Sequence, residues 1–93
     1  MNKKEAQSIL EELIEGYREL NYKELIKLIE NVETFQVVGD SGTQYQLEVQ
    51  AFWDDRPKGN LRVLGSIDDG GIRAFVPLSV DFILAPDGTF IGE

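Results

Sequence analysis

The segment IRAFVPLSVDFIL, residues 72–84, has the clearest alternation of apolar residues in this 93-residue chain. Because successive side chains of a strand point to opposite faces, this period of two predicts a strand with one face in the core and one in water. The predicted inward residues are Ile72, Ala74, Val76, Leu78, Val80, Phe82 and Leu84, and the outward ones are Arg73, Phe75, Pro77, Ser79, Asp81 and Ile83. Pro77 has no backbone N–H, so we expect this strand at an edge of a sheet or at a bulge.

Similar runs precede this segment, at residues 44–53 and from residue 61 onward, with Tyr45, Leu47, Val49, Ala51 and Trp53 inward in the first of them. Turn-forming clusters separate the runs: GDSG at 39–42, DDRPKG at 54–59, DDGG at 68–71 and APDG at 85–88. Connections this short join antiparallel neighbours, because a parallel crossover needs about a dozen residues or more. The pattern predicts a four- to five-stranded antiparallel meander sheet over residues 34–92, with a short fifth strand from Thr89 to Gly92.

Before residue 33 the hydrophobic period is helical. Apolar residues recur at helical spacing at Ala6, Ile9, Leu10, Leu13, Ile14 and Tyr17, and again at Tyr22, Leu25, Ile26, Ile29 and Val32. Asn21, with Glu24 three residues later, has the pattern of a capping box. We therefore expect helices at 3–19 and 22–31, both packed on the inner face of the sheet, with fraying from Gly16 as the alternative. The expected fold is a single α+β domain over residues 1–93.

Composition excludes several functions. The chain has no His and no Cys, so common catalytic triads and zinc sites cannot be built. Its net charge of −8 disfavours nucleic acid and anionic membranes. No apolar run is long enough for a membrane span, and the start of the chain lacks a secretory-signal pattern. We expect a cytoplasmic, non-enzymatic protein without a cofactor.

Two stretches resemble known families. The tail DDGGIRAFVPLSVDFILAPDGTFIGE, residues 68–93, resembles that of a family of short, uncharacterised bacterial proteins of cyanobacterial type, to which no activity is attached. The helical stretch EELIEGYRELNYKELIKLIE, residues 11–30, is similar to the opening of nuclear-transport-factor-2-like and cystatin-like domains, in which helices pack into a curved antiparallel sheet. This sequence departs from the nuclear-transport-factor-2-like pattern, which has a third helix and a longer sheet. The resemblances imply an α+β fold and assign no functional residue.

Acidic residues concentrate at the predicted turns. In a meander, Asp40, Asp68 and Asp69 lie at one end of the sheet, and Asp54, Asp55 and Asp87 at the other. Such carboxylates suit Ca²⁺ or Mg²⁺, but Asp and Gly are also what tight turns require, and no EF-hand spacing is present. We favour turn chemistry and predict no metal site. Trp53 precedes two acids in the sequence, an arrangement that would suit a glycosidase site. Its inward parity favours a core residue instead.

The outward face of the sheet is the main candidate for function. We take Leu61 opposite Trp53 and Ile72 opposite Ile67, because these registers keep the apolar residues on one side. Leu64 would then lie beside Phe75 and Gln50, and Phe52 beside Arg62 and Pro77, with Ile83 extending the group.

Large apolar residues around an arginine are typical of protein contacts. The predicted partner-binding residues are therefore Phe52, Arg62, Leu64 and Phe75, contacting a protein partner or a second copy. Two alternatives are an ordinary sheet surface and coverage by the C-terminal tail. A different function is small-ligand binding in a pocket between helices and sheet, lined by Tyr17, Tyr22, Tyr45 and Trp53.

Overall fold

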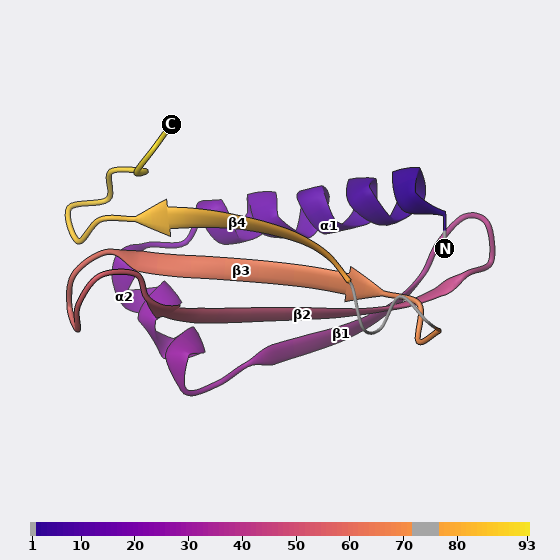
Figure 1. Ribbon diagram of the computed structural model, residues 1–93, viewed down its shortest axis with the longest axis horizontal. Coiled ribbons are helices and arrows are strands. Elements are labelled where there is room, and N and C mark those ends of the chain that lie inside the picture. The colour runs from indigo at the N-terminus through magenta and orange to yellow at the C-terminus, as the bar shows by residue number, and fades with distance from the viewer. Residues whose placement is uncertain (1, 72–76) are drawn as a thin grey trace.

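Helices pack against one antiparallel sheet in the computed structural model, which describes residues 2–71 and 77–93 (Figure 1). The elements are α1 (Lys3–Arg18), α2 (Tyr22–Ile26), the 3₁₀ helix η1 (Lys27–Ile29), β1 (Glu33–Val38), β2 (Gln44–Trp53), β3 (Leu61–Asp68) and β4 (Leu78–Leu84). In the described part of the chain, the sheet has four strands in the order β1-β2-β3-β4. The predicted α+β class and antiparallel meander are confirmed.

Side-chain caps fix where the helices begin. The Asn2 side chain accepts a hydrogen bond from the Glu5 backbone N–H at 3.0 Å, which starts α1. Asn21 and Glu24 form the predicted capping box of α2. Each cap satisfies a backbone N–H that the first helical turn leaves unpaired. The first helix continues through Gly16 to Arg18, so it does not fray at the glycine.

The core lies between the helices and the inner face of the sheet. α1 contacts β3 and β4, η1 contacts β2, and α2 contacts both β2 and β3. Gly65 of β3 allows the close approach of α1, because a Cβ there would lie 2.5 Å from Cδ1 of Ile14. Buried core residues are Ala6, Leu10, Ile14, Tyr17, Leu25, Leu28, Tyr45, Leu47, Val49, Ala51, Leu61, Val63, Ile67, Phe82 and Leu84. The residues of β2 that were predicted to point inward are therefore buried or, at Trp53, partly buried.

The predicted fifth strand is not formed in the described residues. A tight turn follows β4: the Gly88 N–H donates to the Ala85 carbonyl at 2.9 Å, and Gly88 has a φ of +91°. Beyond it, Phe90 makes only an isolated bridge with Leu84. The last residues turn toward α1, where Glu93 bonds to Arg18, and this direction ends the pairing.

The register between β3 and β4 also differs from the prediction. Ile67 lies opposite Leu78 rather than Ile72. These two candidates are six positions apart, and an even displacement keeps the same side chains inward. Alternation therefore determines the face of a strand but leaves its displacement open. The first part of the predicted strand, residues 72–76, lies outside the described residues.

No helix in the described part of the chain is both long and apolar enough to cross a membrane.

Candidate functional site

Neighbouring positions on β2, β3 and β4 form a mixed patch on the outer face of the sheet. Phe52 lies opposite Arg62, and Arg62 lies opposite Ile83 on its other side. Leu64 lies opposite Gln50, as predicted. We call Phe52, Arg62, Leu64 and Ile83 the outer patch.

Two predicted neighbours of the outer patch are wrong. The register of β4 places Asp81, not Phe75, beside Leu64, and Ile83, not Pro77, beside Arg62. Phe75, the fourth predicted contact residue, lies outside the described residues. Pro77 lies just before the first residue of β4, at the sheet edge where a proline is tolerated.

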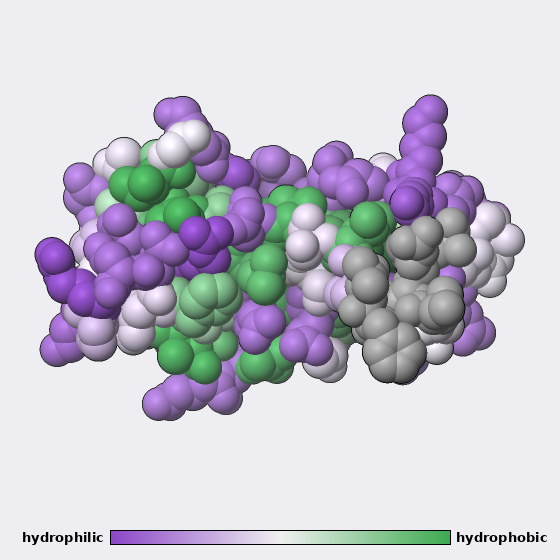
Figure 2. Space-filling view, viewed as in Figure 1, coloured by the Kyte–Doolittle hydropathy of each residue, from purple (hydrophilic) through white to green (hydrophobic). Residues whose placement is uncertain are grey.

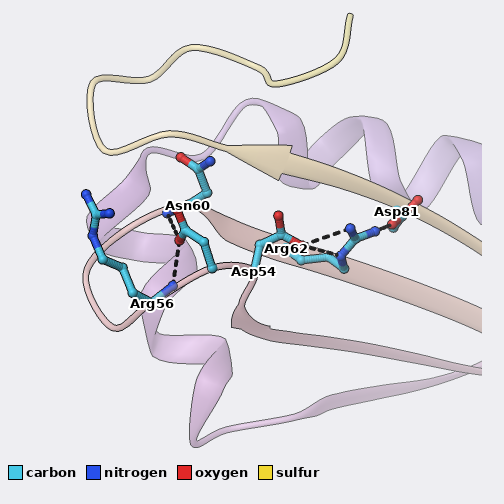
Figure 3. Close-up of polar contacts among 6 residues, drawn as sticks. Asp54, Arg56, Asn60, Arg62 and Asp81 are labelled. Carbon is cyan, nitrogen blue, oxygen red and sulfur yellow. Dashed lines mark hydrogen bonds and ion pairs between the residues drawn. The ribbon is translucent and has the colours of Figure 1, made fainter.

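The guanidinium of Arg62 lies between two carboxylates (Figure 3). Its Nε donates to Oδ1 of Asp54 at 3.0 Å, and a second nitrogen lies 2.8 Å from the same oxygen. A third nitrogen bonds to Oδ2 of Asp81. The bond to Asp54, followed by that to Asp81, raises the pKa of Arg62. The arginine is thus held in place, and the three groups together carry a net charge of −1.

Phe52, the most exposed residue of the outer patch, lies where β2 extends beyond β1. β1 begins opposite Val49, so the last residues of β2, from Gln50 to Trp53, have no β1 neighbour. Phe52 lies in this overhang and is 42% exposed. Leu64, diagonal to Phe52 on β3, and Ile83, on the far side of Arg62, are partly exposed. Figure 2, drawn from the viewpoint of Figure 1, shows apolar surface in the middle and left of the molecule, between hydrophilic side chains.

The C-terminal tail does not take the predicted alternative role of covering this patch. Arg18 of α1 makes two hydrogen bonds to Glu93, at 2.8 and 2.7 Å. Its guanidinium also lies 5.0 Å from the ring centre of Phe82 and 4.9 Å from that of Phe90. The tail is therefore fastened on the α1 side by an ion pair and by cation–π contacts. Sequence reasoning missed this cluster because its members are far apart in the chain.

Aspartates at the turns bond to the backbone of their own loops. Asp68 accepts from the Gly70 N–H at 2.8 Å, and Asp87 accepts from the Thr89 N–H at 2.9 Å. Asp55 accepts from the N–H groups of Arg56 and Asn60, which are drawn in Figure 3. The Arg56 bond is the main cause of the lowered pKa of Asp55. These contacts are the turn chemistry that we favoured over metal binding.

Within the described residues, no three acidic groups are placed to hold a metal ion.

The four aromatic residues of the predicted ligand pocket do not share one site: Tyr22 and Trp53 contact each other, whereas Tyr17 and Tyr45 bond elsewhere. Tyr45 is 1% exposed, and its hydroxyl donates to Glu5 at 2.8 Å. The Tyr17 hydroxyl donates to a carboxylate of β1, and the Tyr22 hydroxyl donates to a loop carbonyl at 2.5 Å. Trp53 packs against Tyr22 with ring centres 6.4 Å apart. The hydroxyls tie the helices to the sheet and its loops and do not point to one common cavity.

Glu5 joins the start of α1 to the turn between β1 and β2. Its carboxylate accepts from the Ser41 hydroxyl at 2.7 Å and from the Ser41 N–H at 3.0 Å, in addition to Tyr45. These bonds, those of Ser41 first, lower the pKa of Glu5. Because every donor belongs to the fold itself, we assign Glu5 a structural role.

Comparison of the chain with protein-family models, curated proteins and solved structures finds no match.

Proposed function

We propose that this chain is a non-enzymatic protein-binding module or small homo-oligomer that makes its contact through the outer patch. The observation that carries the proposal is the 42% exposure of Phe52 beside two partly exposed aliphatic residues, Leu64 and Ile83. Aromatic and arginine side chains are enriched where protein contacts concentrate their binding energy. An aromatic residue left open by the end of a neighbouring strand supplies area that a partner can bury.

The charges around Arg62 support the same reading. An unpaired arginine would have to be desolvated alone when a partner covers the patch, which is costly. Here Asp54 and Asp81 already orient the guanidinium and bond to it. The partner surface therefore needs no carboxylate for this arginine. An apolar surface with a neutral or weakly basic rim fits it best, since the three groups carry one excess negative charge.

Photo-crosslinking from position 52 tests the proposal. A benzoylphenylalanine in place of Phe52 should give a crosslinked product in the source cell, whose mass identifies either another protein or a second copy. The control places the same group at Glu48, which is exposed on the same face of the same strand. Equal or absent products from both positions would contradict the proposal.

A charge variant supplies an independent check. Leu64→Glu should abolish the product from position 52, because a contact centre tolerates an unpaired charge poorly. Ser66→Glu, on the same face of β3, should leave the product unchanged. Thermal melts of both variants establish that they are folded. Persistence of the product in folded Leu64→Glu would remove the outer patch as the contact.

A further inference from the structure

The edge of β1 that faces away from β2 is a second surface that could bind another chain, through its backbone N–H and C=O groups. In the described part of the sheet, β1 is the terminal strand on the side opposite β4 (Figure 1). It carries no proline, lysine or arginine, and its register with β2 is continuous from Glu33 opposite Val49 to Val38 opposite Gln44, without a bulge. Proteins usually protect a sheet edge with one of these devices.

The other edge of the sheet is protected, which makes the open β1 edge distinctive. On β4, Pro77 precedes the strand, and the Ile83 carbonyl accepts from the Ile91 N–H at 2.9 Å. Phe90 bridges to Leu84, and the tail is fastened to α1. α1 itself lies on β3 and β4. Both the helix and the tail therefore cover the side of the sheet that is remote from β1.

The hydrogen-bond alternation shows which backbone groups the edge offers. The Gly39 N–H donates to the Thr43 carbonyl at 2.8 Å, so the hydrogen-bonded pairs of β1 with β2 are those at Gly39 and at every second residue before it. The N–H and C=O groups of the intervening residues, Thr34, Gln36 and Val38, consequently point away from β2. Within residues 2–71 and 77–93 these groups have no hydrogen-bond partner, so they are available to another strand.

Apolar side chains accompany these groups. Phe35 has inward parity, opposite the buried Leu47, yet it is 37% exposed, and α1 makes its main contacts with β3 and β4 instead. Val38 is 65% exposed and Val32 is 47% exposed. A strand added at this edge would satisfy the backbone groups and bury these side chains, as in β-strand addition.

We propose that the β1 edge pairs with the β1 edge of a second copy, antiparallel, about a two-fold axis through Gln36. All three residues whose backbone groups point away from β2 then form pairs with the second copy. Gln36 lies opposite Gln36 of the second copy, and Thr34 lies opposite Val38 of the second copy. Any other symmetric register that aligns these groups uses at most two of the three. On the inner face, Phe35 lies opposite Val37 of the second copy, an aromatic and β-branched pair of the kind that stabilises sheets.

The absence of local charge allows two copies to meet at the β1 edge, in spite of the net charge of −8 on each chain. Residues 34–38 carry no charged side chain. In the proposed register Glu33 lies opposite Gly39 of the second copy, so no two acidic groups are directly opposed. The Glu33 carboxylate already accepts from the Tyr17 hydroxyl. The contact is therefore neutral, and the repulsion between the chains acts only at longer range, where salt screens it.

Single cysteines test the register, because the native chain contains none. Gln36→Cys should form a disulfide-linked dimer under mild oxidation, since the axis brings the two thiols together at a spacing that a disulfide can span. The matched control is Gln46→Cys: Gln46 is also exposed and lies directly opposite Gln36 on β2. Equal crosslinking of the two variants would overturn the proposed register.

Charge reversal tests the same contact without a covalent bond. Gln36→Lys should weaken self-association in sedimentation equilibrium by about tenfold, because two like charges would face each other across the interface. Mixing Gln36→Lys with Gln36→Glu should restore pairing, whereas Gln46→Lys should leave it unchanged. Native self-association should strengthen as salt is raised. A chain that remains monomeric at millimolar concentration, or whose association weakens with salt, would refute the proposal.

The experiments on the β1 edge can fail or succeed independently of those on the outer patch. Leu64→Glu should leave the Gln36→Cys crosslink intact, because Leu64 lies on β3, two strands from the edge. If Leu64→Glu abolishes the dimer and Gln36→Lys does not, the dimer forms through the outer patch, and the pairing of β1 edges is wrong.

Discussion

Replacing Gly65 by Ala tests how closely α1 lies on the sheet. The new Cβ would be 2.5 Å from Cδ1 of Ile14, 3.0 Å from its Cγ1 and 3.1 Å from Cδ1 of Leu10. Carbon atoms in good contact are about 3.5–4.0 Å apart, so the first of these contacts is short by about 1 Å. Ile14 is 2% exposed and Leu10 is fully buried, which leaves neither side chain free space to move into.

We expect Gly65→Ala to lower the free energy of unfolding by about 1–3 kcal/mol, the usual range for an overpacked core. In a domain of this size that corresponds to a fall in melting temperature of about 4–8 °C per kcal/mol. Urea and thermal unfolding followed by circular dichroism measure it. The control is Gly16→Ala: a Cβ at Gly16 meets nothing within 4 Å, so this change should stabilise the helix slightly.

A double-mutant cycle identifies the clash as the cause. Ile14→Val removes the clashing Cδ1 and alone should cost about 0.5–1.5 kcal/mol. Combined with Gly65→Ala it should cost clearly less than the sum of the two, because the valine makes room for the new methyl group. Additive losses, or a Gly65→Ala variant as stable as the parent, would refute the close packing of α1 on β3.

Three further changes probe the faces and the charges. Leu47→Ala, at a residue 2% exposed, should lose about 2–4 kcal/mol of unfolding free energy, whereas Leu64→Ala on the outer face should lose far less; equal losses in chemical unfolding would mean that both faces are buried. Hydrogen bonds, mainly from Ser41, lower the pKa of Glu5 in the folded state from its ordinary value of 4.5. The stability that this carboxylate contributes is therefore present above pH 4.5 and is lost as the pH falls through the folded-state pKa. Glu5→Gln should consequently reduce the dependence of the free energy of unfolding on pH in the acid range. Thermal melts with a chelator and with millimolar Ca²⁺ should superimpose, and a saturable rise in melting temperature that Asp68→Asn removes would contradict the assignment of this carboxylate to its turn.

Local patterns predicted α1 and the faces of β2 well, whereas the helix expected at 22–31 is divided into α2 and η1. The capping box at Asn21 and the alternation along β2 each depend on residues within a few positions of one another, and both are confirmed. The register of β2 with β3 was also predictable, because a short loop leaves little freedom: Trp53 lies opposite Leu61 as expected. A short turn and a matching apolar face together restrict the pairing to one register.

The register of β4 was not predictable in the same way. Apolar residues occupy every second position from Ile72 to Leu84, so several displacements of this strand bury the same face. The error carried over to the candidate site. With Pro77 placed beside Arg62, the proximity of Asp81 to the arginine was missed.

The two exposed surfaces have separate structural causes, the shortness of β1 and the position of α1 over β3 and β4. β1 spans Glu33–Val38, whereas β2 spans Gln44–Trp53, because the chain before Glu33 is held in α2 and η1 against β2. The overhang of β2 leaves Phe52 open on the outer face, while α1, placed over β3 and β4, leaves the β1 edge bare. Pairing at the β1 edge would extend the sheet laterally without covering the overhang. The outer patches of both copies would then stay accessible, and self-association and partner binding could occur in the same assembly.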